Sequence, residues 1–555
     1  MINKDVISIS KSDTIKDLSN KIEKFKFKNI YPIAIYFEDK IPKGILTLGD
    51  LRRLIKSKSE SQATKYLNRN PVIISDKLIN NNLLSSINLE IKKRKIKNIN
   101  EILLVNNKKK FLGIMNMSEI EENFNFKSTT VVGLGHVGLP LLVSLSKKNF
   151  KINGFDIDKK KIKDLNRGEI NFLEENLTNN LKNELKKKKI NFFHKISEIN
   201  SQIIIVCLGH ELYKKKINDK KLYTLTKSLS KIIKANDIII LRGTVKVGYT
   251  RNIFVKTLEK FSNLKCGKDF FVGYMPERLL EGNALNEIEE IPQIISGYSK
   301  NCLEKINKYS VRQFNKTISA SSIEEAEIIK LASNSYRDLN FAFSNEISRL
   351  ADNNNLLGSE LIKKANFGYK RNHIAKPSIG VGGSCLPKDP LIFSSSTNKN
   401  KGYIFSKLSR YSNNNSIKRA VNKIQRFKNK FFKNNYKLKI LILGIAFKGT
   451  PETIDVRNSP GLEIYNMLKV KNQVYMHDVN ASYIKKQNKN LKITKDFRLN
   501  KYDLILVIND HSEYKKLIYR KIAKNNSDSK KMIFDPWRLV DKEYCVSNNW
   551  IYESV

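Results

Sequence analysis

The chain has 555 residues, of which 40% are hydrophobic, and a formal net charge of +48 at pH 7. This length exceeds what a single hydrophobic core organises, so several domains are expected. The lysines are spread along the whole chain among asparagines and isoleucines, so a nucleic-acid partner is not expected. The positive charge favours the approach of polyanionic ligands such as nucleotides.

The cysteines and the apolar segments indicate the compartment. Five cysteines, at positions 207, 266, 302, 385 and 545, form no CxxC pair and no disulfide framework, which indicates a reducing environment. The start of the chain contains no apolar segment of signal-peptide length, and the longest apolar runs have the length of strands. The sequence therefore predicts a cytoplasmic protein without a membrane partner.

The region of residues 1–125 contains an internal repeat. Segments 31–55 and 98–122 each read as a strand, a polar turn, a second strand and the start of a helix. This pattern resembles a tandem CBS pair, an α+β module that often binds adenine nucleotides. The resemblance implies contacts to the ribose and phosphate of such a ligand for Thr47 and Asp50.

The second copy of the repeat departs from this pattern. It carries Asn116 and Glu119 where the first copy has the threonine and the aspartate. A regulatory module that binds an adenine nucleotide and a purely structural or dimerising module fit the pattern equally well. Both interpretations remain open.

A dinucleotide-binding pattern follows, in a domain expected over residues 126–318. A buried strand leads into a GxGxxG turn, then a helix, and then a second strand that ends at Asp156. The glycines let the backbone approach a pyrophosphate at the helix N-terminus. Because Asp156 can accept hydrogen bonds from both ribose hydroxyls, the pattern favours NAD over NADP. The residues of the turn expected to contact the cofactor are Gly133, Gly135, His136, Val137 and Gly138.

A long helical stretch opens the central segment, which is expected over residues 319–425. It begins with a capping-box pattern at Ser322 and Glu325. Its helical period places Lys330 and Asn334 on one face, one turn apart.

Residues 426–555 repeat the doubly wound pattern. The segment 436–449 ends a strand in a glycine turn, and a following strand ends at Asp478. The order matches that of the first sheet, so the expected fold is α/β, with Rossmann-like domains on both sides of the helical segment. In the central segment, the stretch KPSIGVGGSCLPKDP places Cys385 in a glycine-rich turn. A metal site is not expected there, because no histidine or second cysteine lies at ligand spacing.

These motifs together resemble the nucleotide-sugar 6-dehydrogenases, which include UDP-glucose, UDP-N-acetylhexosamine and GDP-mannose enzymes. The resemblance covers roughly residues 128–550. It rests on GLGHVGLP, GTVKVG, YMPERLLEGNAL, EIIKLASNSYRDLNFAFSNEI, GVGGSCLPKDP and GIAFKGTPETIDVRNSP. It implies NAD on the first Rossmann-like domain, a UDP-sugar on the last, and a homodimer formed through the central helix.

The reaction implied by the resemblance gives Cys385 a role. Oxidation of the C6 hydroxyl to an acid removes two hydrides, and an aldehyde is a poor hydride donor until a nucleophile adds to it. A thiolate forms a thiohemiacetal, whose oxidation leaves a thioester that water cleaves. Cys385 is expected to be this nucleophile rather than a buried filler, with Lys388 and nearby cations lowering the pKa of its thiol.

The resemblance also implies the partners of the cysteine. Lys330 and Asn334 are expected to hold the alkoxide or oxyanion. Asp389 and Glu277 are expected to position and activate water. Thr244 is expected near that water, and Glu281 near the nicotinamide. The cations expected to bind the UDP-sugar are Arg371, Lys376, Lys448 and Arg457. The resemblance implies that Arg457 acts in the site of the neighbouring subunit.

Departures from the family pattern lie near the cofactor path. His210 and Glu211 stand where the family usually has Thr-Pro, and Gly243 stands where it usually has a serine. The PER and GNAL motifs favour a UDP-N-acetylhexosamine over UDP-glucose as substrate. The alternatives are a single-step dehydrogenase of the 3-hydroxyacid type and a nucleotide-sensing regulatory protein with an inactive enzyme body.

Overall fold

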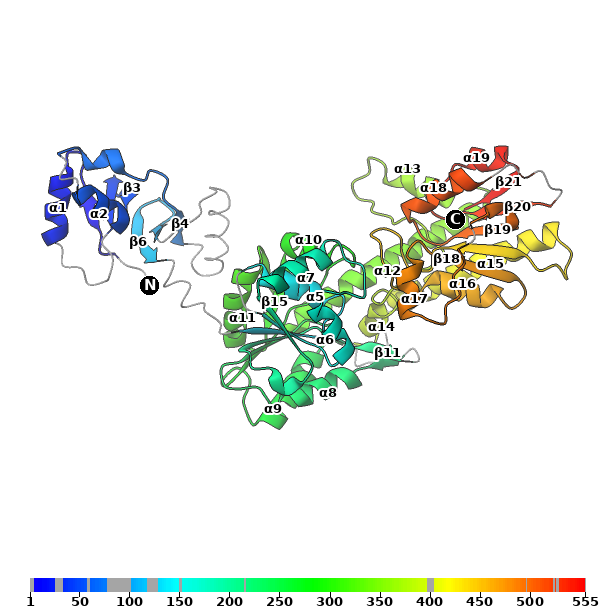
Figure 1. Cartoon of the computed structure of the whole chain (residues 1–555), viewed down its shortest axis with the longest axis horizontal. Coiled ribbons are helices and arrows are strands. Elements are labelled where there is room, and N and C mark those ends of the chain that lie inside the picture. The colour runs from blue at the N-terminus through cyan, green and yellow to red at the C-terminus, as the bar shows by residue number, and fades with distance from the viewer. Residues whose placement is uncertain are drawn as a thin grey trace. The chain divides into compact units, whose positions relative to one another are not determined.

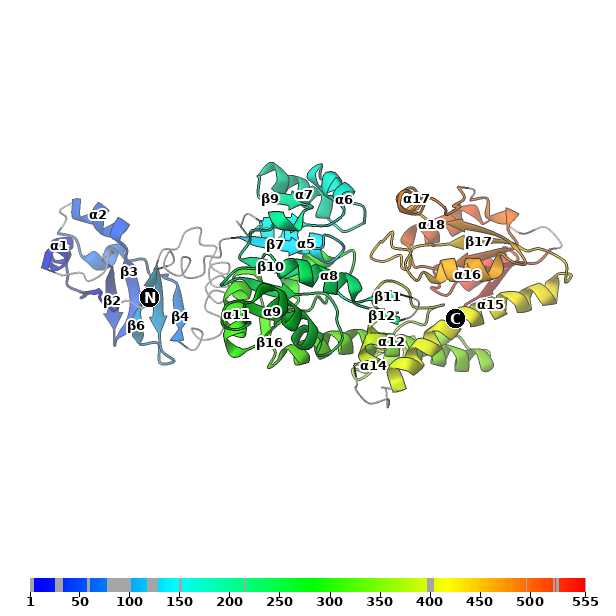
Figure 2. The same ribbon diagram turned by 90° about the horizontal axis from the view of Figure 1, so that it is seen from below.

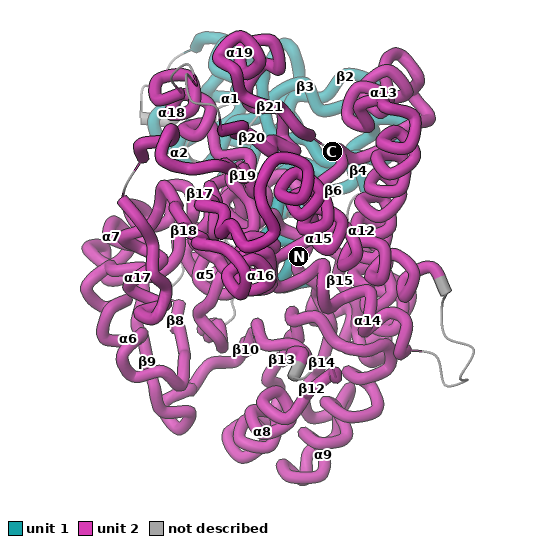
Figure 3. The backbone as a smooth tube through the Cα atoms, turned by 90° about the vertical axis from the view of Figure 1, so that its right-hand side faces the viewer, with its two compact units in different colours: residues 1–127, 307–317 teal, residues 128–306, 318–555 magenta. Residues whose placement is uncertain are grey.

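The computed structural model (Figure 1; Figure 2 shows the same ribbon from below) describes residues 4–24, 33–56, 60–76, 101–116, 128–148, 152–213, 216–396, 404–495, 497–522, 525 and 529–554. The chain divides into two compact units, coloured separately in Figure 3. One unit holds residues 1–127 with 307–317, and the other holds residues 128–306 with 318–555.

In the smaller unit, one sheet topology occurs twice among the described residues. In each sheet the first strand pairs in parallel with the second, and the second pairs antiparallel with the third. Ile35 and Ile45 of the first sheet share a buried cluster with Leu103 and Ile114 of the second, so the halves have a common core. The expected internal repeat is therefore confirmed. Its elements are β1 (Ile7–Ile9), α1 (Ile15–Lys24), β2 (Ala34–Glu38), β3 (Ile41–Leu46), α2 (Leu48–Lys56), η1 (Ala63–Tyr66), β4 (Ile73–Ser75), β5 (Glu101–Val105) and β6 (Phe111–Asn116).

The first sheet of the larger unit has the order β16-β15-β14-β13-β10-β7-β8-β9. Neighbouring strands from β9 to β14 run parallel, and β15 runs antiparallel to β14. Strands β8 and β9 extend the sheet on one side of β7, and β10, β13 and β14 extend it on the other side. The order of strands therefore reverses between β7 and β10, and doubly wound sheets bind dinucleotides at such a point. The strands are β7 (Thr129–Val132), β8 (Ile152–Phe155), β9 (Ile190–Phe193), β10 (Ile203–Val206), β13 (Ile238–Leu241), β14 (Phe271–Tyr274), β15 (Gln293–Gly297) and β16 (Thr317–Ser319).

Helices cover both faces of this sheet, which is why β10 and β13 are continuous, fully buried apolar runs. The helices are α5 (Gly138–Ser146), α6 (Lys159–Asn166), α7 (Leu177–Lys186), η3 (Ile196–Glu198), α8 (Lys220–Leu229), η4 (Thr250–Val255), α9 (Lys256–Ser262), α10 (Ala284–Glu290) and α11 (Lys300–Gln313). A hairpin of β11 (Glu211–Tyr213) and β12 (Lys216–Asn218) follows β10.

The central segment is built on a long helix, α12 (Ile323–Asn353). The side chain of Ser322 accepts a hydrogen bond from the backbone N–H of Glu325, as its capping pattern predicts. A buried ion pair of 2.5 Å between Asp338 and Arg410 joins α12 to α15, and Figure 2 shows these helices running side by side. The other helices of the segment are α13 (Gly358–Asn366), α14 (Asp389–Ser394) and α15 (Ile404–Phe431).

The C-terminal sheet has the order β18-β17-β19-β20-β21, with all neighbours parallel. Ile417 and Ile424 of α15 pack into the same buried cluster as Ile440 and Ile442 of β17, which attaches the central helices to this sheet. The elements are β17 (Lys439–Leu443), α16 (Pro460–Leu468), β18 (Gln473–His477), α17 (Ala481–Gln487), η5 (Leu499–Lys501), β19 (Leu504–Val507), α18 (Ser512–Lys521), β20 (Lys531–Phe534), α19 (Lys542–Ser547) and β21 (Trp550–Glu553). The expected α/β fold, with Rossmann-like sheets joined by a helical segment, is confirmed.

Candidate functional site

The predicted catalytic residues converge where the NAD-side sheet, α12 and the cysteine loop meet. Asp389 is the first residue of α14 and is fully buried. Its Oδ2 accepts a hydrogen bond of 2.6 Å from Nδ2 of Asn334 on α12. Its Oδ1 lies 3.2 Å from the ammonium of Lys388. The backbone N–H of Asp389 donates to the carbonyl of Cys385, so cysteine and carboxylate belong to one helical turn.

Lys330 lies on α12 one turn before Asn334, as its spacing predicted. Its ammonium is 3.7 Å from Oε2 of Glu277, which follows β14, and both side chains are buried. Burial lowers the pKa of Lys330, but the carboxylates of Glu277 and Asp389 and the thiol of Cys385 outweigh it, so the pKa is raised above its ordinary value. The lysine therefore stays protonated and can stabilise a developing negative charge beside Cys385.

The thiol of Cys385 is in contact with solvent, and the Oγ of Ser384 is 3.5 Å from its sulfur. The protein atoms packed around the thiol raise its pKa above the ordinary value, as does the carboxylate of Asp389. Lys330 and Lys388 lower this pKa but do not outweigh those effects. Lys388 and Lys330 thus act in the expected direction, but the net pKa of the thiol is raised and not lowered.

The glycines before Cys385 allow the loop to pack against the C-terminal domain. Gly383 has a φ of 86°, and a Cβ there would lie 3.0 Å from the ring of Phe447. Its N–H donates to the carbonyl of Arg457, and its carbonyl accepts from Nδ2 of Asn458. The position of Cys385 thus depends on the domain expected to hold the UDP moiety.

The glycine turn after β7 fits a dinucleotide. Gly133 has a φ of 91°, and a Cβ on Gly138 would lie 1.9 Å from the carbonyl oxygen of Gly133. Asp156, at the end of β8, accepts a hydrogen bond from the backbone of Leu134 in this turn and pairs with the ammonium of Lys161 at 2.7 Å. Backbone donors and a carboxylate therefore face the place where a ribose and a pyrophosphate would lie.

Glu281 lies between the two Rossmann-like domains. Its Oε1 is 3.6 Å from Nδ1 of His136 in the glycine turn and accepts a hydrogen bond of 2.5 Å from Thr453. Lys448 donates to the carbonyl of Glu281 at 2.5 Å. Burial lowers the pKa of His136 and of Lys448. Glu281 thus links the cofactor turn to the loop that carries Lys448.

The residues that depart from the family pattern, Gly243 and His210, contact neighbouring loops. A Cβ on Gly243 would lie 1.9 Å from the carbonyl oxygen of Leu208, so glycine lets the loops after β10 and β13 touch. The N–H of His210 donates to the carbonyl of Thr244, and the ring of His210 packs edge-on against Tyr249 at 4.4 Å. Burial lowers the pKa of His210 to about 4, so its imidazole is neutral at pH 7.

The structure adds a connection through Lys388 that sequence reasoning missed. Besides Asp389, its ammonium binds the carbonyl of His210 at 3.0 Å, which ties the cysteine loop to the cofactor domain.

Glu327, one turn before Lys330 on α12, was also missed by sequence reasoning. It is fully buried and accepts hydrogen bonds from the backbone of Gly248 and from the backbone and hydroxyl of Thr250, and burial raises its pKa to about 7. Its only sequence signal was its position on α12 one turn before Lys330, on the side of the helix that also carries Asn334.

The cations predicted to bind substrate are dispersed. Arg457 makes a two-pronged pair with Asp455, through Nε at 2.9 Å and Nη2 at 2.6 Å. Arg371 lies over the ring of Tyr369 at 4.7 Å, and Lys376 is exposed. Within the described part of the chain, no hydrogen bond or ion pair joins Arg371 or Lys376 to another predicted site residue.

In the smaller unit, Thr47 and Asp50 contact each other at the start of α2. Asp50 accepts from the backbone and hydroxyl of Thr47 at 3.0 and 2.8 Å, and Arg53 pairs with the same carboxylate at 2.6 Å. Thr14 and Asp17 make the same arrangement at the start of α1. The pair is thus a capping motif as well as a candidate ligand contact. Glu119 of the second copy lies outside the described residues.

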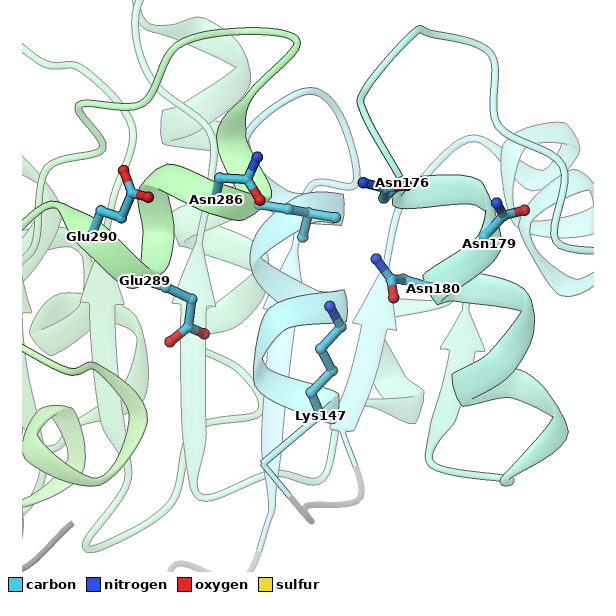
Figure 4. Close-up of a pocket in the computed structure, with 8 residues that line it drawn as sticks. Lys147, Asn176, Asn179, Asn180, Asn286, Glu289 and Glu290 are labelled. Carbon is cyan, nitrogen blue, oxygen red and sulfur yellow. The ribbon is translucent and has the colours of Figure 1, made fainter. Parts of the chain in front are cut away.

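Other features of the described residues lie apart from this site. A polar hollow of about 440 Å³ opens between α5, α7 and α10 (Figure 4), and no predicted site residue lines it. In the described ranges, no cluster of three or more histidine, cysteine or acidic side chains is arranged to hold a metal ion. No described helix is long and apolar enough to cross a membrane.

Comparisons with known proteins agree with this arrangement. Models of the UDP-glucose/GDP-mannose dehydrogenase family match residues 127–310 (NAD binding domain), 324–416 (central domain) and 441–542 (UDP binding domain). A CBS domain model matches residues 1–57.

Individual relatives are similar over most of their length. A UDP-N-acetyl-D-mannosamine dehydrogenase of Campylobacter jejuni is 31% identical over 405 residues, covering 70% of this chain and 96% of that protein. The corresponding protein of Pyrococcus horikoshii is 28% identical over 399 residues, covering 71% and 92%. A solved structure of UDP-D-ManNAc dehydrogenase from Pyrococcus horikoshii superimposes with a TM-score of 0.69 at 25% identity, covering 77% of this chain and 99% of that chain.

Proposed function

Because the chain belongs to the UDP-glucose/GDP-mannose dehydrogenase family, we propose that it oxidises a UDP-N-acetylhexosamine at C6 to the uronic acid by a four-electron reaction through Cys385. The chain is an NAD-dependent nucleotide-sugar 6-dehydrogenase, as the motifs predicted. UDP-N-acetylmannosamine is the favoured substrate, because relatives bearing that name match the whole enzyme body. UDP-N-acetylglucosamine and then UDP-glucose follow. The acidic sugar would serve as a precursor of a surface polysaccharide.

The observation that carries the four-electron proposal is the single helical turn that joins Cys385 to Asp389, beside Lys330. NAD, when bound, accepts the hydride that leaves C6. The ammonium of Lys330 and the amide of Asn334 hold the negative charge on the C6 oxygen. Cys385 adds to the aldehyde carbon and forms a thiohemiacetal, and loss of the second hydride leaves a thioester.

Hydrolysis of the thioester then requires a placed water molecule. Asp389 and Glu277 are the carboxylates that raise the pKa of Lys330, and they are proposed to orient that water and take its proton. Attack of the water oxygen breaks the C–S bond and returns the sulfur as the thiol.

Other residues are proposed to bind the substrate and the cofactor. Arg457 and Lys448 would bind the UDP-sugar, and Glu281 would lie by the nicotinamide. Arg457 would reach the neighbouring subunit's site after it releases Asp455. Arg371 and Lys376 are proposed to bind the UDP-sugar with Arg457 and Lys448.

We expect the purified protein to make two NADH for each nucleotide sugar consumed, since one enzyme performs both oxidations. NADH absorbance and product mass should be followed over a panel of UDP- and GDP-sugars. UDP-N-acetylmannosamine should give the highest kcat/KM. A yield of one NADH, with free aldehyde accumulating, would contradict the four-electron assignment and favour a single-step dehydrogenase.

We also propose that the protein is a homodimer that pairs through α12 and α15. Tyr336, Phe343 and Leu350 form an exposed apolar row along α12, with exposed fractions of 61%, 55% and 66%. Phe405 and Tyr411 on α15 are similarly exposed. Rows of large apolar side chains on a water-soluble surface mark protein interfaces, and a two-fold axis would pair such a row with itself.

A Phe343→Asp variant is expected to shift the protein from dimer to monomer, because the new carboxylate would be buried without a partner. Light scattering coupled to size exclusion measures the mass. Val470→Asp, at a position 76% exposed on the C-terminal domain, is the matched control and should leave the mass unchanged. A monomeric wild type, or a dimeric Phe343→Asp variant, would contradict this interface.

The CBS domain is proposed to bind an adenine nucleotide through Thr47 and Asp50 and to alter the activity. The family model that matches residues 1–57 supports nucleotide binding. A coupling of about 1–3 kcal/mol, or roughly 5- to 150-fold in affinity, is typical of such regulation.

Calorimetric titration of the full-length protein with ATP, ADP and AMP should detect binding by at least one of them. Asp50→Asn should abolish it, and Asp17→Asn, which alters the equivalent cap on α1, should preserve it. If none of the nucleotides binds, or if both variants bind alike, the module is structural rather than a sensor of these ligands.

A further inference from the structure

Cys266 and Cys302 lie far apart in sequence and meet in the cofactor domain. Cys266 is in the turn before β14, and Cys302 is in the first turn of α11. Their sulfur atoms are 4.0 Å apart. All five cysteines of the chain lie in the described residues, and all are free thiols. The proposed reaction at Cys385 uses neither member of this pair.

The backbone around the pair is held in place independently of the sulfurs. Nδ2 of Asn301 donates to the carbonyl of Gly267 at 2.9 Å. A Cβ on Gly267 would lie 3.0 Å from Oγ of Ser299 and 3.9 Å from the sulfur of Cys302, so the turn and the helix are in close contact. The N–H of Cys266 donates to Glu259 at 3.1 Å. A disulfide bond has a sulfur–sulfur length of about 2.05 Å, so the two sulfurs need to approach each other by about 2 Å.

The electrostatics of the pair favour reaction. A hydrogen bond from the Cys266 thiol lowers the pKa of Cys302 to about 6, helped by hydrogen bonds from Ser299. The same contact and burial raise the pKa of Cys266. At pH 7 the pair therefore holds a thiolate, which is the reactive form in disulfide chemistry, whereas the pKa of Cys385 is raised. Cys302 is fully buried, whereas Cys266 is partly exposed to solvent.

We propose that Cys266 and Cys302 form a reversible oxidation site that a hydroperoxide converts to a disulfide. The O–O bond of the peroxide breaks and an S–S bond forms. The two sulfurs lose two electrons together, and their protons leave with the peroxide oxygens. Two thiols and one hydrogen peroxide thus give one disulfide and two water molecules. A thiol reductant reverses the change.

The bond would link the turn before β14 to α11 without disturbing the catalytic residues. Cys266 precedes the amino end of β14, whereas Glu277 follows its carboxyl end. Closing this link restricts the unfolded chain and so stabilises the domain. Oxidation is therefore expected to raise the thermal midpoint by about 5 °C while kcat stays within about two-fold.

The test uses the full-length Cys385→Ser variant, so that the catalytic thiol cannot contribute. The protein is titrated with hydrogen peroxide at pH 7, quenched with catalase and then denatured for thiol counting and peptide mass mapping. We expect the loss of two thiols, a peptide cross-linked between positions 266 and 302, a rise in the thermal midpoint, and full reversal by dithiothreitol. The wild-type protein, oxidised in parallel, supplies the kcat measurement.

The variants Cys266→Ser and Cys302→Ser serve as controls. Each should lose the cross-link and the shift in midpoint, and if one fails to fold, peptide mapping of the other still decides the point. A cross-linked peptide with unchanged stability would overturn the stabilising role. Sulfinic acid at either position, or five thiols remaining in the wild type after the same treatment, would overturn the site itself.

Discussion

A Cys385→Ser variant is expected to bind substrate and cofactor like the wild type and to lose about 10³-fold or more in complete turnover. Serine preserves the shape of the loop, whose glycines still pack on Phe447. A serine hydroxyl has a much higher pKa than a thiol and is a poor leaving group for hydrolysis, so the route through a thioester closes. The first hydride can still leave the alcohol, because Lys330 and Asn334 remain.

Rapid mixing of the variant with NAD and the sugar nucleotide should therefore show a burst of NADH no larger than one per site, followed by a very slow phase. Hydroxylamine should trap the aldehyde in the variant but not in the wild type. Cys545→Ser is the control for loss of a thiol elsewhere, since Cys545 lies in the core of the C-terminal domain and away from the site. Wild-type rates in Cys385→Ser would show that this cysteine only packs in the loop and is not the nucleophile.

The sequence predicted the parts of the site in which local backbone geometry decides the residue type. Gly133 is needed because its φ of 91° is one that other residues rarely adopt, and Gly138 because a Cβ there would strike the carbonyl oxygen of Gly133. Helical spacing alone placed Lys330 beside Asn334, and the strand–turn–helix order placed Asp156 at the cofactor turn. Each of these inferences needs only a few consecutive residues, which is why it holds without knowledge of the tertiary contacts.

Contacts between distant segments could not be predicted in the same way. The bond from Lys388 to the carbonyl of His210 joins a central loop to a turn of the cofactor domain, and no periodicity in the sequence signals it. The net direction of the pKa shift of Cys385 could not be predicted for a related reason. Counting nearby lysines ignores the protein atoms packed around the thiol and the carboxylate of Asp389, both of which depend on the fold. The pairing of Arg457 with Asp455 is likewise visible only in the structure.

A Lys330→Met variant is expected to lower kcat by about 10²- to 10³-fold with a much smaller change in KM, because the buried ammonium acts on charge that develops during reaction. Methionine retains most of the side-chain volume and leaves the packing of α12 against the sheet in place. The substitution leaves Glu277 without its ion-pair partner, so the free energy of unfolding should fall as well, by about 3 kcal/mol. Thermal denaturation of the variant separates that loss from the kinetic effect.

The same variant tests the electrostatics of the cysteine. Lys330 is one of the cations that lower the pKa of Cys385, so its removal raises a pKa that already lies above the ordinary 9.0. Below the pKa, the thiolate fraction rises ten-fold for each pH unit. Alkylation of Cys385 by iodoacetamide should therefore accelerate with pH up to a midpoint above 9. In Lys330→Met this midpoint should lie at a higher pH. Lys221→Met is the matched control, because Lys221 pairs with Glu211 at 3.0 Å on the exposed surface, where such pairs contribute little. An unchanged alkylation profile combined with a normal kcat in Lys330→Met would show that this lysine only stabilises the fold.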